Sequence, residues 1–154
     1  MVKSVLTRFR EEKKSLVVAE SCTGGLLMSA LTEIPSASEV FLGGIVAYSN
    51  AIKENVLHVS SVTLAINGAV SSECVLEMVK GLFEITNADV AIAVSGIFGP
   101  SGGTQEKPVG TVWMAIGERG KPPKSILIPL EANLIRGTYR ETVVTYLIEA
   151  LWKL

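Results

Sequence analysis

The run Asp89-Val90-Ala91-Ile92-Ala93-Val94 constrains the fold most strongly, because after Asp89 it is apolar at consecutive positions rather than at alternate ones. Strands that helices cover on both faces have this pattern, and they occur in sheets that are largely parallel. We therefore expect 89–94 to be the central strand of an α/β protein. The glycine-rich segment that follows it would then lie at the carboxyl end of the sheet.

The rest of the chain alternates between helical and strand patterns, with no internal repeat and no linker. This alternation predicts a single domain over residues 1–154, folded as a three-layer αβα sandwich with a mixed, mostly parallel central sheet. We predict helices over 2–9, 26–34, around Lys53, after Ser60-Ser61, over 72–83 and over 137–152, and strands over 15–19, the second half of 41–48, 89–94, 109–116 and 125–129, the last two as a hairpin.

The charge and the hydropathy of the chain limit the kinds of partner that it is expected to have. The formal net charge is -1 and 19% of the residues are charged, so no electrostatic footprint for nucleic acid is expected. No apolar stretch approaches the ~20 residues of a membrane span, and the N-terminus has no signal-peptide pattern, which favours a cytoplasmic location. The apolar content of 48% and the free thiols expected at Cys22 and Cys74 suit a cytoplasmic homo-oligomer.

The segment Ala19-Glu20-Ser21-Cys22-Thr23-Gly24-Gly25 stands between a strand pattern and a helix pattern. The first N–H groups of a helix have no partner inside it, so such a turn can hold an anion or a developing oxyanion. Ser21 is therefore a candidate nucleophile, with Cys22 as a rival. Alternatively, Ser21 or Thr23 only caps the helix, as such residues often do.

A serine nucleophile needs a base, and His58, the single histidine, has no second metal ligand or triad partner nearby in sequence. A lysine serves this role when burial lowers its pKa, because only the neutral amine accepts a proton. Lys53 lies in the small, apolar segment Ala51-Ile52-Lys53 and is the best candidate, with Tyr48 orienting it or relaying the proton. The alternatives are a solvent-facing lysine and a tyrosine that closes the core.

The glycine-rich segment from Ser95 to Thr104 lacks both the Gly-Lys-Ser/Thr ending of a Walker loop and the spacing of a dinucleotide-binding motif. It can still present backbone N–H groups to an anion or an amide, unless it is purely a structural turn. Arg136 and Arg140 stand near the start of the last helix, where positive charge opposes the helix dipole. One of them is expected to have an anionic partner, on a ligand or on a nearby glutamate such as Glu131 or Glu141.

Four segments are informative when they are taken together: 19–25, 44–50 with Lys53, 68–71, and 95–103 continuing through 107–112. In this order they resemble the CinA C-terminal domain family, whose single-domain members are bacterial nicotinamide mononucleotide deamidases. The resemblance covers nearly the whole chain. It departs from the family at Leu134-Ile135, where Gly-Asp is usual, and at Phe98, where a smaller residue is usual.

The resemblance implies a serine amidohydrolase that converts nicotinamide mononucleotide into nicotinic acid mononucleotide and ammonia without a metal or an organic cofactor. The implied catalytic residues are Ser21, Lys53 and Tyr48. Alternatives are a non-catalytic module that binds a nucleotide or a protein, and an amidase for another small amide. The residues expected to contact the substrate are Cys22, Thr23, Gly24, Gly25, Asn50, Ser95, Gly96, Gly99, Gly102, Gly103, Thr104, Lys107 and Arg140.

Overall fold

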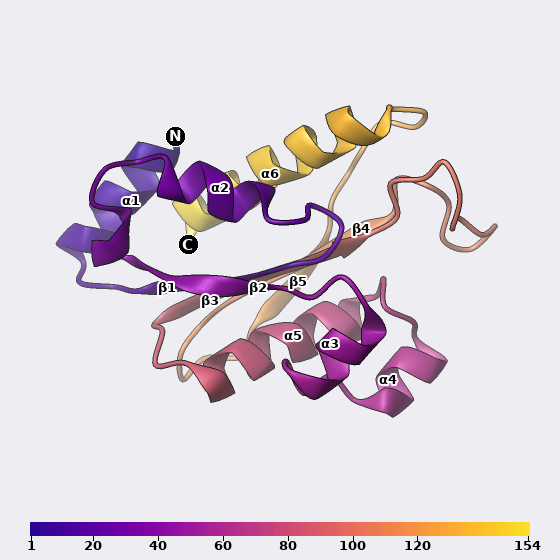
Figure 1. Ribbon diagram of the computed structural model, residues 1–154, viewed down its shortest axis with the longest axis horizontal. Coiled ribbons are helices and arrows are strands. Elements are labelled where there is room, and N and C mark those ends of the chain that lie inside the picture. Colours follow the sequence, from indigo (N-terminus) through magenta and orange to yellow (C-terminus); the bar gives the residue numbers. More distant parts are fainter.

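The computed structural model describes residues 1–154, which form one five-stranded sheet with α-helices and one short 3-10 helix (Figure 1). The elements are α1 (Val2–Glu11), β1 (Leu16–Glu20), α2 (Leu26–Thr32), η1 (Ala37–Glu39), β2 (Phe41–Val46), α3 (Asn50–Asn55), α4 (Ser61–Ile66), α5 (Ser72–Ile85), β3 (Val90–Gly96), β4 (Val112–Glu118), β5 (Lys124–Leu127) and α6 (Arg136–Lys153).

The sheet has the strand order β2-β1-β3-β4-β5, so β3 is the central strand, as predicted. Strand β1 pairs in parallel with β2 and β3, whereas β4 pairs antiparallel with both β3 and β5. The sheet is therefore mixed, with its pairings divided evenly between the two kinds. Only β4 runs against the other four strands, and β4 and β5 form the predicted hairpin.

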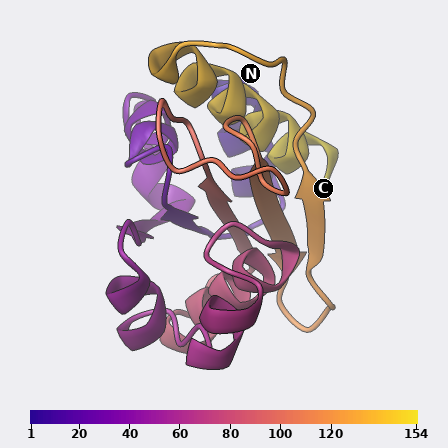
Figure 2. The same ribbon diagram turned by 90° about the vertical axis from the view of Figure 1, so that its right-hand side faces the viewer.

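Helices cover both faces of this sheet: α1, α2 and α6 on one side, and α3, α4 and α5 on the other (Figures 1 and 2). The residues of β3 divide accordingly. Ile92 and Val94 belong to the core cluster that includes the buried residues of α6, and Ala91 and Ala93 belong to the cluster that includes those of α5. This two-sided burial explains why 90–94 is apolar at every position.

Strand β2 begins at Phe41, earlier than predicted, and its glycines lie inside the strand. A Cβ at Gly44 would stand 2.4 Å from the Val18 carbonyl oxygen, so close packing against β1 requires glycine there. Tyr48 lies beyond the end of β2. No helix of the protein is both long enough and apolar enough to cross a membrane.

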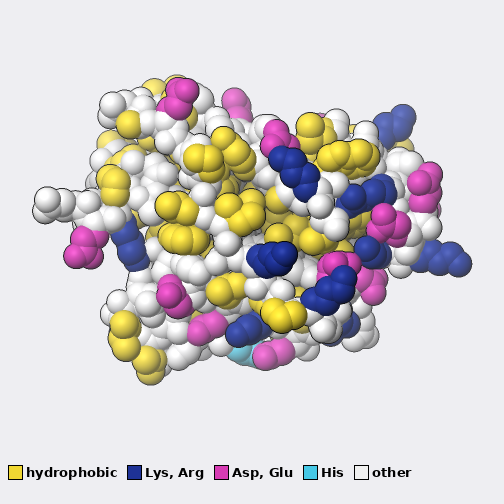
Figure 3. Space-filling view, turned by 180° about the vertical axis from the view of Figure 1, so that it is seen from behind, with side chains coloured by type: hydrophobic (Ala, Val, Ile, Leu, Met, Phe, Trp, Pro, Cys, Tyr) yellow, Lys and Arg dark blue, Asp and Glu magenta, His cyan; other side chains and the backbone are white.

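The face seen in Figure 3 lies on the β5 side; hydrophobic side chains are spread over it, and lysines and arginines gather mostly toward one end, together with acidic side chains. Ile126 and Leu127 of β5 are among the exposed large hydrophobic residues. This strand is one of the two edges of the sheet, and β2 is the other.

Candidate active site

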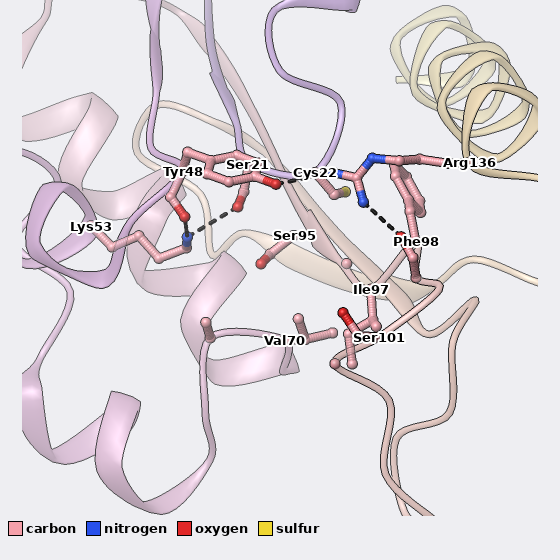
Figure 4. A pocket seen from close by; sticks show the side chains of 14 residues that line it. Ser21, Cys22, Tyr48, Lys53, Val70, Ser95, Ile97, Phe98, Ser101 and Arg136 are labelled. Carbon is pink, nitrogen blue, oxygen red and sulfur yellow. Dashed lines mark hydrogen bonds between the residues drawn. The ribbon is translucent and has the colours of Figure 1, made fainter.

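Ser21 directly follows β1 and lies at the carboxyl edge of the parallel part of the sheet (Figure 4). Its backbone N–H donates to the Val94 carbonyl of β3 at 3.1 Å, which fixes the start of the turn against the central strand. The side chain is buried but lines a cavity. Ligands of open α/β sheets bind at this edge, so the predicted place of Ser21 agrees with the topology.

Lys53 belongs to α3, and its side chain reaches Ser21. Ser49 caps that helix by accepting a hydrogen bond from the Ile52 amide at 3.2 Å. The Lys53 Nζ atom lies 3.0 Å from Ser21 Oγ, and only 1% of the residue is exposed. The structure therefore brings together two residues that are 32 positions apart in sequence.

Two backbone carbonyls complete the surroundings of the Lys53 amine: Ala47 O at 2.6 Å and Tyr48 O at 3.4 Å. A neutral amine has two N–H bonds and one lone pair. It can donate to both carbonyls and accept the Ser21 hydroxyl proton, whereas a protonated amine would donate to all three oxygens. Burial lowers the pKa of Lys53 below its ordinary value of 10.5, in the direction that a base requires.

Cys22 is a weak rival to Ser21 as a nucleophile. Burial raises the pKa of its thiol to about 12, and only the thiolate attacks efficiently. Cys74, in α5, is also a buried free thiol, and burial raises its pKa to about 11. Both cysteines are unpaired, as expected from their spacing.

The start of α2 is capped differently from either reading of the sequence. Gly25 is the N-cap residue, and neither Ser21 nor Thr23 caps the helix. The buried Glu20 carboxylate accepts hydrogen bonds from the amides of Gly25 at 3.1 Å, Leu27 at 3.2 Å and Met28 at 2.8 Å. Sequence reasoning missed this role of Glu20.

Because these amides are occupied, fewer oxyanion donors remain than the sequence suggested. The Gly24 amide donates to the Ser21 carbonyl at 3.1 Å and closes a turn. The backbone N–H groups of Cys22 and Thr23, at the centre of that turn, donate to no oxygen atom of the protein. Cys22 lines the cavity, whereas Thr23 is fully buried, so the Cys22 amide is the donor next to Ser21 that a developing oxyanion can use.

Arg136 and Arg140 stand one helical turn apart on α6 and have different neighbours. Arg136 donates to the Gly99 carbonyl at 2.9 Å and to the Tyr48 hydroxyl at 3.0 Å, and it lines the cavity. Arg140 donates to the Thr23 carbonyl and does not line the cavity. Neither arginine pairs with a carboxylate, so the glutamate partners considered from the sequence are absent.

The cavity has a volume of about 320 Å³, and no acidic side chain lines it. With Lys53 and Arg136 in its wall, it favours a neutral or anionic ligand. Eight residues predicted for the site line it: Ser21, Cys22, Tyr48, Lys53, Ser95, Gly96, Gly99 and Gly102. The lining also includes Ala69, Val70, Ile97, Phe98, Ser101 and Arg136, which were not among the predicted site residues.

The remaining predicted substrate contacts lie outside this cavity lining. Thr23 is fully buried, and Asn50 is an exposed residue at the start of α3. The Lys107 ammonium donates to the Asn67 carbonyl, so it ties the glycine-rich loop to the turn after α4. The complete set outside the lining is Thr23, Gly24, Gly25, Asn50, Gly103, Thr104, Lys107 and Arg140.

Some of the missed residues had a signal in the sequence. Ala69 and Val70 belong to the segment 68–71, which was singled out without a role, and Phe98 was noted as unusual for its position. Phe98 is 4% exposed and stacks on Tyr139 of α6, with ring centroids 5.6 Å apart. No group of three or more His, Cys, Asp or Glu side chains is placed to hold a metal ion.

The fold and the site define an α/β protein with a buried serine–lysine pair in a cavity at the carboxyl edge of its sheet. The chain belongs to the CinA C-terminal domain family, whose model matches residues 1–154.

Several relatives support this assignment. A CinA-like protein of Thermotoga maritima is 55% identical over 136 residues, which is 88% of this chain and 33% of the relative. The chain thus spans about a third of the length of the curated relatives it matches.

Solved structures give the same result. The competence/damage inducible protein of Agrobacterium tumefaciens has a TM-score of 0.94 and 37% identity, covering 99% of this chain and 92% of that one. A CinA superfamily protein of Escherichia coli has a TM-score of 0.90 and 30% identity, covering 99% and 89%.

Proposed function

We propose that this protein hydrolyses the carboxamide of nicotinamide mononucleotide, with Ser21 as nucleophile and Lys53 as base. The observation that carries the proposal is the 3.0 Å contact between Lys53 Nζ and Ser21 Oγ, together with the burial that lowers the pKa of Lys53. A lysine that is held neutral beside a serine hydroxyl has the chemistry of an activated nucleophile. Family membership and the segment resemblances support the choice of substrate.

In the first half of the reaction, Lys53 accepts the Ser21 proton as Oγ attacks the carboxamide carbon. The negative charge that develops on the carbonyl oxygen is stabilised by the free amide of Cys22, which lines the cavity. Loss of one such donor typically costs about 3 kcal/mol of transition-state stabilisation. Lys53 then gives its proton to the departing nitrogen, and the C–N bond breaks to release ammonia.

In the second half, water attacks the acyl-serine ester and Lys53 accepts a proton from it. The tetrahedral intermediate uses the same amide, because its oxyanion forms at the same place. The Ser21–carbonyl bond then breaks, the serine regains its proton, and nicotinic acid mononucleotide leaves. Every proton in this cycle passes through one amine, so no metal ion or organic cofactor is needed.

The phosphate of the substrate would bind at the glycine-rich end of the cavity. The backbone N–H groups of Gly99, Ser101 and Gly102 have no acceptor within the protein, and Arg136 lies beside them. Amides and a guanidinium group are common phosphate ligands. In this proposal Arg136 replaces Lys107 and Arg140, the basic residues expected from the sequence.

Tyr48 contributes in two ways. Its backbone carbonyl is one of the acceptors that hold the Lys53 amine, and its hydroxyl accepts a hydrogen bond from Arg136. The hydroxyl is bonded to neither Ser21 nor Lys53, so we propose that it positions Arg136 rather than relaying the proton.

The test measures ammonia release from nicotinamide mononucleotide by purified wild-type protein, Ser21→Ala and Lys53→Met. We expect both variants to lose at least about 10³-fold in kcat, as expected when a nucleophile or its base is removed. Exposed residues supply matched controls, Ser29→Ala and Lys80→Met, which should retain wild-type rates.

Three other results would contradict the proposal. Wild-type rates in Ser21→Ala or Lys53→Met would remove the assigned roles. Binding of the nucleotide without any turnover by the wild-type protein would indicate a non-catalytic module. Ser21-dependent release of ammonia only from another small amide would keep the mechanism but change the substrate.

A further inference from the structure

The structure assigns Arg140 a role as a positioning residue that holds the oxyanion-binding turn after Ser21. This inference rests on the proposed serine chemistry, but not on the identity of the substrate. Its basis is the contact between the Arg140 guanidinium and the Thr23 carbonyl oxygen, with Nε at 3.2 Å and Nη2 at 2.9 Å.

Both contacts come from one edge of a planar guanidinium, so they restrain the direction of the carbonyl as well as its place. The guanidinium also lies against the turn itself, because a Cβ at Gly24 would be 3.7 Å from Nη2. Gly24 has a φ of 62°, a conformation that favours glycine. Arg140 has no carboxylate within 4 Å, so its charge acts on the turn without a neutralising partner.

The restraint reaches the oxyanion donor through two planar peptide groups. The Thr23 carbonyl and the Gly24 N–H belong to one peptide, and that N–H donates to the Ser21 carbonyl at 3.1 Å. The Ser21 carbonyl and the Cys22 N–H belong to a second peptide group, and this N–H is free to face the substrate. A chain of hydrogen bonds therefore runs from Arg140 to the peptide group that carries the proposed donor, the Cys22 N–H.

This chain has an electrostatic as well as a geometric effect. Linked hydrogen bonds polarise one another, and each bond is strengthened by about 10–30%. A permanent positive charge at the outer end makes each successive N–H a better donor, including that of Cys22. Arg140 thus acts on the transition state without lining the cavity or touching the ligand.

The test compares Arg140→Met, Arg140→Lys and the control Arg119→Met. Arg119 also donates to backbone carbonyls, those of Ala88 at 2.8 Å and Thr86 at 2.6 Å, but it stands at the end of β4 and does not line the cavity. We expect Arg140→Met to lower kcat about 10- to 100-fold with KM changed less than about 3-fold, since misplacement by about 1 Å costs that much. Arg140→Lys should recover part of the loss, and Arg119→Met should keep the wild-type kcat.

A second readout separates this inference from the choice of substrate. An alkyl fluorophosphonate reacts with an activated serine: the Oγ–P bond forms, the P–F bond breaks, fluoride leaves and Lys53 takes the proton. The P=O oxygen occupies the oxyanion position, so Arg140→Met should slow this labelling of Ser21 as it slows kcat. Labelling that slows in Arg140→Met, while no variant hydrolyses nicotinamide mononucleotide, would uphold the inference and reject the substrate.

Wild-type labelling rates and wild-type kcat in Arg140→Met would overturn the inference, as would a change confined to KM. A loss of labelling equal to that of Arg119→Met would do the same, because it would indicate destabilisation alone. Absence of labelling in the wild-type protein would reject the serine chemistry, and the inference with it. If Arg140→Met does not fold, the comparison of Arg140→Lys with Arg119→Met decides in the same way.

Discussion

At the scale of single residues, the site depends on a lysine that is buried without a carboxylate. Lys53 is 1% exposed, and its Nζ contacts only uncharged oxygens. A protonated amine in this place loses its hydration without gaining an ion pair, which is why the pKa of Lys53 is lowered. The burial that lowers the pKa of Lys53 also makes the stability of the protein depend on pH.

We predict that the wild-type protein gains stability relative to Lys53→Met as pH rises. Between the lowered pKa of Lys53 in the folded protein and its ordinary value of 10.5, the unfolded chain carries a proton that the folded protein lacks. Folding is therefore favoured by higher pH, with a slope of up to about 1.4 kcal/mol per pH unit. Urea unfolding of both proteins from pH 6 to pH 10 measures the difference.

Lys80→Met is the control for this titration, because Lys80 is exposed. Its difference in unfolding free energy from the wild type should not change over the same range. A difference between wild type and Lys53→Met that stays constant with pH would contradict a lowered pKa. The ascending limb of kcat/KM should follow the same ionisation, since only the neutral amine accepts the Ser21 proton.

At the scale of elements, the start of α2 joins the site to the fold. The Glu20 carboxylate, at the end of β1, takes three of the helix amides and leaves those of Cys22 and Thr23 free. A negative charge at a helix N-terminus is also favoured by the helix dipole. Glu20 therefore determines which amides of the turn remain available for chemistry.

We predict that Glu20→Gln destabilises the protein by about 2 kcal/mol, because hydrogen bonds to a charged acceptor are worth about 1.5–3 kcal/mol. The amide also replaces one acceptor oxygen by an NH₂ group, which would face a backbone N–H. Urea unfolding at pH 7 measures the change, with the exposed Glu54→Gln as control. Equal stability of Glu20→Gln and wild type would show that the carboxylate does not cap the helix.

Most helices and strands could be predicted from the sequence, because the spacing of apolar residues along each of them reflects which of its faces are buried. The central strand is apolar throughout since helices cover both of its faces, and the last helix shows its buried positions at the expected spacing. Strand β2 was placed too late, because its glycines suit a close approach to β1 that no local pattern reveals. Contacts between elements, rather than propensity, decide such a boundary.

The candidate site was predicted in part, for similar reasons. The residue types of Ser21 and Lys53 suggested a pair, and the fold places them in contact. Arg140 was the arginine predicted to contact the substrate, but Arg136 is the one that lines the cavity. The two stand one turn apart on the same helix, and the loops opposite them, which decide their contacts, do not appear in a local sequence pattern. The role of Glu20 depends on how a strand end meets the next helix, which periodicity does not describe.

At the scale of the whole molecule, the two edges of the sheet differ. Strand β5 carries Lys124 and is flanked by Pro122, Pro123 and Pro129. Lysine and proline residues at an edge strand disfavour its pairing with a strand of another chain. Strand β2, Phe41-Leu42-Gly43-Gly44-Ile45-Val46, has neither, and it lies at the near edge of the sheet in Figure 1.

The outward-facing backbone N–H and C=O groups of β2 are suited to pairing with a strand of another molecule. The Ala47 amide bonds to the Glu20 carbonyl of β1 at 2.8 Å, so strand alternation turns the backbone groups of Val46 and Gly44 outward. Leu42 and Val46 are 54% and 44% exposed. An uncharged strand can pair antiparallel with its own copy across a two-fold axis, since the same surface is used on both sides.

The homo-oligomer expected from the apolar composition would then be a dimer joined through β2. We predict that the wild-type protein elutes as a dimer in size-exclusion chromatography with light scattering, and that Leu42→Lys shifts it toward the monomer by placing like charges at the pairing edge. Ile126→Lys is the matched control, because Ile126 is 43% exposed on the opposite edge strand. A monomeric wild type, or dissociation by Ile126→Lys but not by Leu42→Lys, would reject β2 as the interface.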